Sequence, residues 1–164
     1  MKKILFVRHG KAKRESGTGR DFDRKLNDKG RIQANVIGHL LEEKKFKADQ
    51  IYSSNAARTK ETILIINEIL TGGTQSIEWK HDLYLCNLTT YLDFCFHLND
   101  KYHTILICGH NFGITDCMNY FTEMDLELST CGTALVSFDV DSWEEISKGT
   151  GVLEWMKMPR EIIE

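Results

Sequence analysis

Apolar residues fill two short runs of the chain, 4–7 and 104–108, and each run ends abruptly in polar residues and glycine. Arg8, His9 and Gly10 follow the first run, and residues 109–111, which include His110, follow the second. Continuous apolar runs of this length are typical of strands that are buried on both faces. A guanidinium or an imidazole needs polar partners instead of burial. We therefore expect these polar residues to lie at one edge of a sheet.

Helical periodicity and turn residues divide the rest of the chain. Apolar residues recur every three or four positions in segments of about 28–45, 56–70, 88–99 and 112–122, which predicts four helices. Shorter β-forming runs predict further strands over 48–52, 75–79, 132–139 and 152–156. Asn27 or Asp28 is expected to cap the first helix, and the run 53–55 the second. Residues 11–27 are polar and contain glycine, which predicts a long loop.

Strands that alternate with helices, followed by a terminal pair of strands, predict a three-layer α/β/α sandwich. We expect a mostly parallel central sheet of about six strands with helices on both faces, in a single domain over residues 1–164. Ligands of open α/β sheets bind at the carboxyl ends of the strands. His9, His110 and Arg58, which stands in the first turn of the second helix, are therefore expected to face one crevice.

Composition narrows the class of protein. The 164 residues are 41% apolar and 27% charged, and the net charge of −3 argues against a general nucleic-acid partner. No apolar run approaches the roughly 20 residues that cross a bilayer, and no signal-peptide pattern precedes the first strand. The five cysteines are odd in number and form no CxxC pair, which predicts free thiols and no metal site. We expect a cytoplasmic protein without a membrane partner.

Two histidines and two arginines at one sheet edge predict a site for a phosphoryl group. Guanidinium groups match phosphate oxygens in pairs, and a neutral imidazole can attack phosphorus. Nearby arginines disfavour the imidazolium, which keeps that nitrogen available. We expect His9 to be the nucleophile and to form a phosphohistidine intermediate. His110 is expected to donate a hydrogen bond to the transferring group, while Arg8 and Arg58 clamp its oxygens.

Four blocks of residues resemble a known family in order and spacing. Arg8-His9-Gly10 resembles the signature of the histidine phosphatase superfamily, which includes the cofactor-dependent phosphoglycerate mutases. Residues 21–30, 53–62 and 109–111 resemble the corresponding blocks of SixA-type phosphohistidine phosphatases, and the short chain fits that branch. The resemblance implies a nucleophile at His9, phosphate ligands at Arg8 and Arg58, and a second histidine at His110.

The resemblance also implies an activity and further candidate residues. It implies metal-free removal of phosphate from phosphohistidine on a partner protein, in signal transduction, with no cofactor and with free phosphate as the product. Arg24 and Asn111 are further candidates for binding the phosphate. For Arg24, an ion pair with Asp21 or Asp23 is the alternative. The histidines outside the motifs, at 39, 81, 97 and 103, are expected to be surface or packing residues.

The chain departs from the family pattern in two places. Lys25 stands where the SixA pattern usually has proline, and the glutamate that serves as the acid in mutases is not apparent after the third predicted strand. Asp21 and Asp82 are the remaining candidates for a general acid. An imidazole leaving group is easier to expel than an alkoxide, so a missing acid favours a phosphoramidate substrate over a phosphate ester.

Other functions stay open at this point. A small-molecule phosphomonoesterase or mutase of the same superfamily would use the same four residues, and so would a non-catalytic phosphate-binding module. No cysteine is followed by arginine six residues later, which excludes a cysteine-based phosphatase. Residues 139–141 read Asp-Val-Asp after an apolar strand, as in aspartyl phosphatases, but Trp143 occupies a position where that signature has a small residue.

Overall fold

The computed structural model describes residues 1–162 and contains one six-stranded sheet, in the order β3-β2-β4-β1-β5-β6. The strands are β1 (Lys2–Arg8), β2 (Gln50–Ser53), β3 (Ile77–Trp79), β4 (Thr104–Gly109), β5 (Thr133–Phe138) and β6 (Gly151–Lys157). The pairs β1·β4, β2·β4 and β2·β3 are parallel, whereas β5 is antiparallel to both β1 and β6. The prediction of a mostly parallel sheet is confirmed.

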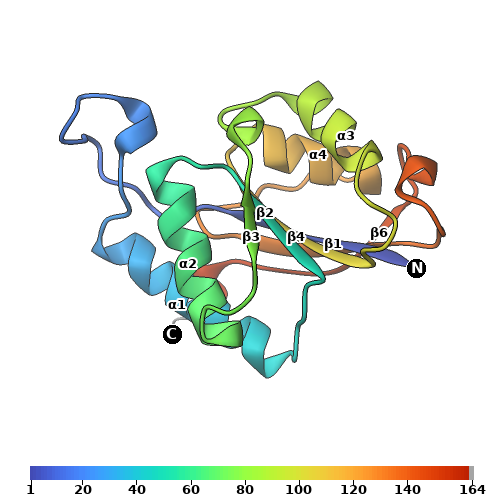
Figure 1. Cartoon of the computed structure of the whole chain (residues 1–164), viewed down its shortest axis with the longest axis horizontal. Coiled ribbons are helices and arrows are strands. Elements are labelled where there is room, and N and C mark those ends of the chain that lie inside the picture. Colours follow the sequence, from blue (N-terminus) through green and yellow to red (C-terminus); the bar gives the residue numbers. More distant parts are fainter. Residues whose placement is uncertain (163–164) are drawn as a thin grey trace.

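Four helices cover the two faces of this sheet. They are α1 (Asp28–Glu43), α2 (Ala57–Thr71), α3 (Leu88–Phe96) and α4 (Gly113–Thr122). Helices α1 and α2 lie together on one face, and α3 and α4 lie on the other (Figure 1). The sandwich architecture predicted from the sequence is therefore confirmed. Four short 3₁₀ turns were not predicted: η1 (Asp21–Asp23), η2 (His81–Leu83), η3 (Trp143–Glu145) and η4 (Pro159–Glu161).

Strand β1 is the rigid centre of the sheet. Ile4 and Phe6 pack into the core under α3 and α4, and Leu5 and Val7 pack into the core under α1 and α2. All four side chains are fully buried, as the continuous apolar run predicts. Because close-packed interiors deform little, this strand is a firm support for the residues that follow it.

One predicted helix cap is present and the other is not. The Asn27 side chain accepts a hydrogen bond from the Gly30 N–H and caps α1, as predicted. The prediction of a side-chain cap on α2 from residues 53–55 is wrong, because the N-cap residue is Ala56. Ser54 precedes Ala56 in the sequence, and its hydroxyl forms a hydrogen bond with Nε2 of the buried His110 ring.

Two sequence-based expectations concern thiols and membranes. Cys86 is half-buried, the four other cysteines are buried, and all five are free, as predicted. Within residues 1–162, the structure has no helix that is both long and apolar enough to cross a membrane.

Candidate active site

The backbone of His9 is fixed where β1 ends. The His9 N–H donates to the carbonyl of Gly109 at the end of β4, at 3.1 Å, and the His9 carbonyl accepts from the Cys131 N–H, at 2.8 Å. The next N–H, that of Gly10, donates to the buried Thr62 hydroxyl of α2. Strand β4, helix α2 and the turn before β5 therefore hold the residue that the motif predicts to be the nucleophile.

The hydrogen bonds of the His9 ring assign a role to each nitrogen. Nδ1 lies 2.6 Å from the carbonyl oxygen of Gly10, which can only accept, so Nδ1 carries the proton. Nε2 is then unprotonated, and its lone pair accepts a long hydrogen bond from the Arg58 Nε–H, at 3.4 Å. Burial, and then the charges of Arg58 and Arg8, lower the pKa of His9 from 6.5 to about 4. His9 is therefore a neutral imidazole at neutral pH.

His110 follows β4 and lies beside His9. The centroids of the two rings are 5.2 Å apart, and His110 is only 2% exposed. Its Nε2 lies 2.8 Å from the Ser54 hydroxyl, while its buried Nδ1 has no hydrogen-bond partner among residues 1–162. Burial, and then the neighbouring His9 and Arg58, lower the pKa of His110 to about 2. The parallel pairing of β1 with β4 (Figure 1) brings the two histidines together.

Arg58 connects this pair of histidines to the long loop. Its side chain is 4% exposed, and its two Nη groups donate to the backbone carbonyl and the carboxylate of Asp21, at 2.8 and 2.9 Å. The same carboxylate accepts from the Tyr84 hydroxyl at 2.6 Å and from Arg24 Nη1 at 2.9 Å. In Figure 1 the blue loop that carries η1 lies beside the start of α2, where this network forms.

These contacts decide the charge of Asp21. Partial burial acts to raise the pKa of its carboxyl, but hydrogen bonds from Tyr84, Arg24 and Arg58 outweigh burial and hold the pKa well below its usual range. Asp21 is thus ionised at neutral pH and lacks the proton that a general acid must give. Asp82, the other candidate, lines a separate cavity beside α3. A general acid at either residue stays a prediction that the geometry does not favour.

The remaining candidates lie around the same cluster. Arg8 Nη1 donates to the Leu128 carbonyl at 2.9 Å, and its buried Nε has no partner in the described part of the chain. The Asn111 side chain donates to the same carbonyl at 3.3 Å and accepts from the Thr115 hydroxyl at 2.5 Å. Asn111 thus uses both ends of its amide within the protein. Arg24 is held by Asp21 and by the Lys13 carbonyl, so the ion pair that was the alternative to phosphate binding is present, with Asp21 as the partner.

Sequence reasoning missed an aromatic cluster on one side of the site. The Tyr84 ring meets His110 edge-on at 5.4 Å and Phe22 at 5.0 Å, and His81 packs against both Phe22 and Tyr84. His81 also lies 3.0 Å from the Asn55 side chain. These residues come from two loops without a periodic pattern, so no signal in the sequence shows that they meet.

The chemistry of the cluster is that of an anion site. Arg58 is almost fully buried and pairs with Asp21, whereas Arg8 is partly buried and makes no ion pair among residues 1–162; both lie close enough to His9 to lower its pKa. Arginine side chains in such surroundings favour a planar or tetrahedral oxyanion such as a phosphoryl group. Among residues 1–162, the structure contains no group of three or more histidine, cysteine or carboxylate side chains placed to hold a metal ion.

Two curated relatives show how far the sequence likeness extends. An uncharacterised chloroplast protein of Arabidopsis thaliana is 25% identical over 162 residues, which is 94% of this chain and 74% of that protein. A 2,3-bisphosphoglycerate-dependent phosphoglycerate mutase of Hamiltonella defensa is 36% identical over 86 residues, which is 49% of this chain. The chain spans only 34% of that mutase.

Solved structures with the same fold include several phosphatases. The protein histidine phosphatase SixA, solved in complex with tungstate, gives a TM-score of 0.83 at 19% identity, over 97% of this chain and 98% of that one. SixA from Agrobacterium tumefaciens gives a TM-score of 0.82 at 23% identity, over 96% of this chain and 98% of that one. A phosphoserine phosphatase from Entamoeba histolytica, solved with phosphoserine, gives 0.68 at 18% identity, over 99% and 100%. These TM-scores establish a shared fold.

The sequence also matches a family model. Residues 4–83 match the model of the histidine phosphatase superfamily, branch 1. The matched stretch contains Arg8, His9 and Arg58, whose side chains meet at the end of β1. The sequence match to the histidine phosphatase superfamily, branch 1, thus covers 80 of the 164 residues and includes three of the four predicted site residues.

Proposed function

We propose that this chain is a metal-independent phosphatase that transfers a phosphoryl group to His9 and then to water. The observation that carries the proposal is the orientation of the His9 ring. The Nδ1 proton is directed at the Gly10 carbonyl, and the unprotonated Nε2 lies beside the Arg58 Nε–H. A neutral nucleophile beside a buried guanidinium is what attack on an anionic phosphoryl group requires.

Two steps complete the proposed reaction. The lone pair of His9 Nε2 forms a bond to phosphorus while the bond from phosphorus to the leaving group breaks, and the leaving group takes up a proton from solvent water. Water then attacks the phosphorus of the phosphohistidine, the bond to Nε2 breaks, and free phosphate leaves. Arg8 and Arg58 lie where they would neutralise the charge on the phosphoryl oxygens in both steps, and the neutral His110 would donate a hydrogen bond to one of these oxygens. Arg24 and Asn111 support this cluster from the loops.

The proposed substrate is phosphohistidine on a protein. The fold shared with SixA supports it, and so does the ionised state of Asp21. Expulsion of an alkoxide needs a proton donor more strongly than expulsion of an imidazole does. A substrate of this kind fits a role in signal transduction, and five free thiols fit the reducing cytoplasm.

A direct test compares three substrates and two variants. The purified chain is incubated with a phosphohistidine protein, a phosphoserine peptide and a sugar phosphate, with and without EDTA. We expect turnover to be fastest on the phosphohistidine protein, unchanged by EDTA, and abolished in His9→Ala. His39→Ala is the matched control, because the His39 side chain is 65% exposed and its ring pairs with Glu42.

Trapping the intermediate tests the mechanism separately. Acid-labile, alkali-stable phosphate should label the wild-type chain on rapid quenching and should be missing from His9→Ala. Hydrolysis that survives in His9→Ala would refute the mechanism. Faster turnover of the phosphoserine peptide or the sugar phosphate would refute the substrate and favour a phosphomonoesterase of the same superfamily. Binding of phosphate without turnover of any substrate would favour a non-catalytic module.

A further inference from the structure

The outer side of helix α1 carries a second row of apolar residues. On the inner side, Ile37 and Leu41 are fully buried in the core that α1 shares with α2. On the outer side, Ile32 is 55% exposed, and Val36 and Leu40 are half-buried. These three residues are spaced four apart, so their side chains form one row along the helix. A surface helix needs only one apolar stripe to pack on its own protein, so the outer row is available for another contact.

A groove runs along this outer row. It has a volume of about 380 Å³, and Ile162, which is 38% exposed, lines it together with the three residues of the row. Polar side chains border it at Asn35, His39 and Glu43. Exposed apolar groups that lie together inside a polar border mark a binding surface. The charges at the two ends of the row indicate what this surface binds.

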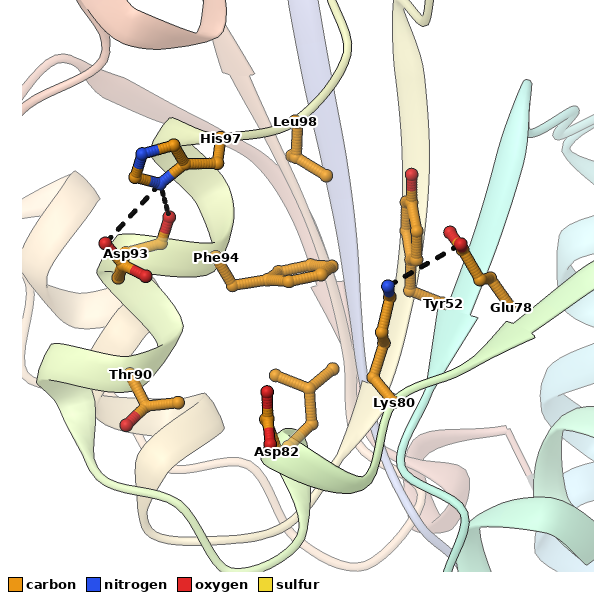
Figure 2. A pocket seen from close by; sticks show the side chains of 10 residues that line it. Tyr52, Glu78, Lys80, Asp82, Thr90, Asp93, Phe94, His97 and Leu98 are labelled. Atoms are coloured by element: carbon orange, nitrogen blue, oxygen red, sulfur yellow. Dashed lines mark hydrogen bonds and ion pairs between the residues drawn. The ribbon is translucent and has the colours of Figure 1, made fainter.

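Opposite charges stand at the two ends of the row. The exposed Lys29 precedes the row by three residues, and the exposed Glu43 follows it by three, so both lie on the same side of α1 as the row. Other surface charges are paired within the chain, such as Lys80 and Glu78, which are 3.5 Å apart (Figure 2). Lys29 and Glu43 form no ion pair within residues 1–162. They are about 21 Å apart along the helix, too far to pair with each other.

The row and its two charges are complementary to a second copy of themselves. Ile32 and Leu40 lie four residues on either side of Val36, and the two charges lie seven residues on either side of it. Two copies of α1 can therefore pack antiparallel about a two-fold axis at Val36. Ile32 then lies level with Leu40 of the partner subunit, and Lys29 lies level with Glu43 of the partner subunit. The symmetry forms each of these contacts twice.

The charges also disfavour the parallel arrangement. Two parallel copies would place Lys29 beside Lys29 of the partner subunit, and the two glutamates beside each other. Like charges in such contacts are destabilising. Antiparallel copies bring opposite charges together and set the two helix dipoles in opposite directions.

We propose that the chain forms a symmetric dimer in which Ile32, Val36 and Leu40 of α1 pack antiparallel against the same row of a second copy. A helix face about 24 Å long is smaller than a standard protein interface, so we expect a dissociation constant in the micromolar range. None of the four predicted catalytic residues lines the groove. The inference therefore does not depend on the proposed function, and either can fail without the other.

Sedimentation equilibrium from low micromolar to near millimolar concentration tests the dimer. We expect the apparent mass to rise from that of one chain towards that of two. Val36→Asp places two carboxylates at the two-fold axis and should keep the mass of one chain throughout. Met124→Asp is the matched control and should dimerise like the wild type, because Met124 is a 43% exposed apolar residue in a cavity beside α4. Circular dichroism shows whether each variant is folded.

Reversal of the charges tests the antiparallel register. Lys29→Glu places two carboxylates opposite each other at both ends of the contact, and Glu43→Lys places two ammonium groups there. Since each change acts twice in a symmetric dimer, we expect each to raise the dissociation constant about tenfold. Lys148→Glu changes an exposed lysine in the cavity beside α4 and should leave the dissociation constant as in the wild type.

Two combinations of the charge variants should restore the dimer. The double variant Lys29→Glu/Glu43→Lys again has opposite charges at both ends of the contact. An equimolar mixture of the two single variants has them only in the mixed dimer. Both samples should dimerise about as tightly as the wild type.

Three results would overturn the inference. The mass of one chain at every concentration would show that α1 does not bind a second copy and leave its outer row to a different protein. A dimer that persists in Val36→Asp would use another surface. A double variant that dimerises as weakly as the single variants would contradict the antiparallel register.

Discussion

The imidazole of His9 differs from an exposed histidine in when it takes up a proton. Its folded-state pKa of about 4 lies well below 6.5, because the ring is buried and faces Arg58 and Arg8. The proposed nucleophile therefore stays unprotonated through the whole range in which an ordinary histidine would titrate.

The pH dependence of turnover should show this difference. After correction for the ionisation of the substrate phosphate, we expect kcat/KM for a small phosphate ester to stay constant from pH 7 to pH 5 and to fall towards pH 4. Arg58→Gln should move this acidic limb to higher pH, because the Arg58 charge that lowers the His9 pKa is lost. Lys60→Gln, a change of an exposed cation on the same helix, should leave it in place. An acidic limb near pH 6.5 in the wild type would contradict the role of His9.

Motifs predicted the four central residues, but not the residues that hold them. Arg8, His9 and His110 follow apolar strands, so the rule for strand ends could bring them together. Arg58 could be added because it opens a helix. Asp21 and Tyr84 lie in loops, whose paths follow no periodicity, and only the folded chain shows that both meet Arg58. Ser54 was expected to cap a helix because its residue type fits that role.

At the scale of elements, helical periodicity predicted the four α-helices and apolar or β-forming runs predicted the six strands, but neither signal shows how closely these elements approach. Ile32 belongs to the apolar pattern of α1 and is nevertheless 55% exposed, while Gly30 and Gly38 are buried. A side chain at Gly30 would collide with the Lys11 backbone, and one at Gly38 would collide with Ile69 of α2. The face of α1 that carries Gly30 and Gly38 therefore lies against its neighbours. The pattern of apolar residues carries no information on such close approaches at glycine.

Strand β4 and helix α3 meet at another glycine, and this contact can be tested. A methyl group on Gly109 would overlap the hydroxyl of the fully buried Tyr91. We expect Gly109→Ala to lower the free energy of unfolding by about 1–3 kcal/mol, since extra volume in a packed core forces neighbours apart. Urea unfolding followed by circular dichroism measures the change.

Two variants show whether Tyr91 is the cause. Gly17→Ala is the matched control, because no atom lies within 4 Å of the added methyl group. Adding Tyr91→Phe to Gly109→Ala removes the clashing oxygen and should restore part of the stability. Equal stability of Gly109→Ala and Gly17→Ala would show that β4 and α3 separate without cost.

At the scale of the whole molecule, the two buried histidines make stability depend on pH. The pKa values of His9 and His110 are about 4 and about 2 in the folded chain, against 6.5 for an exposed histidine. Below pH 6.5 the unfolded chain therefore binds more protons than the folded one, and the free energy of unfolding falls as the pH falls.

Urea unfolding at pH 7 and at pH 4.5 measures this dependence. We expect a clear loss of stability at pH 4.5 and a smaller loss in His110→Asn, which lacks one of the two groups. In His39→Asn an exposed histidine is replaced. The free energy of unfolding of this variant should fall between pH 7 and pH 4.5 by as much as that of the wild type. An identical loss in the wild type and in His110→Asn would show that the buried ring does not contribute.

The position of β1 in the sheet has a consequence for synthesis of the protein on the ribosome. Both neighbours of β1 are synthesised long after it, because Ile4 pairs with Ile105 of β4 and with Val136 of β5. The strand that precedes His9 is made before both of its partner strands and stays unpaired until they have emerged from the ribosome. Contacts so distant in sequence also slow folding. We therefore expect nascent chains to expose an apolar strand for a long time, which makes them natural clients of chaperones that bind such segments.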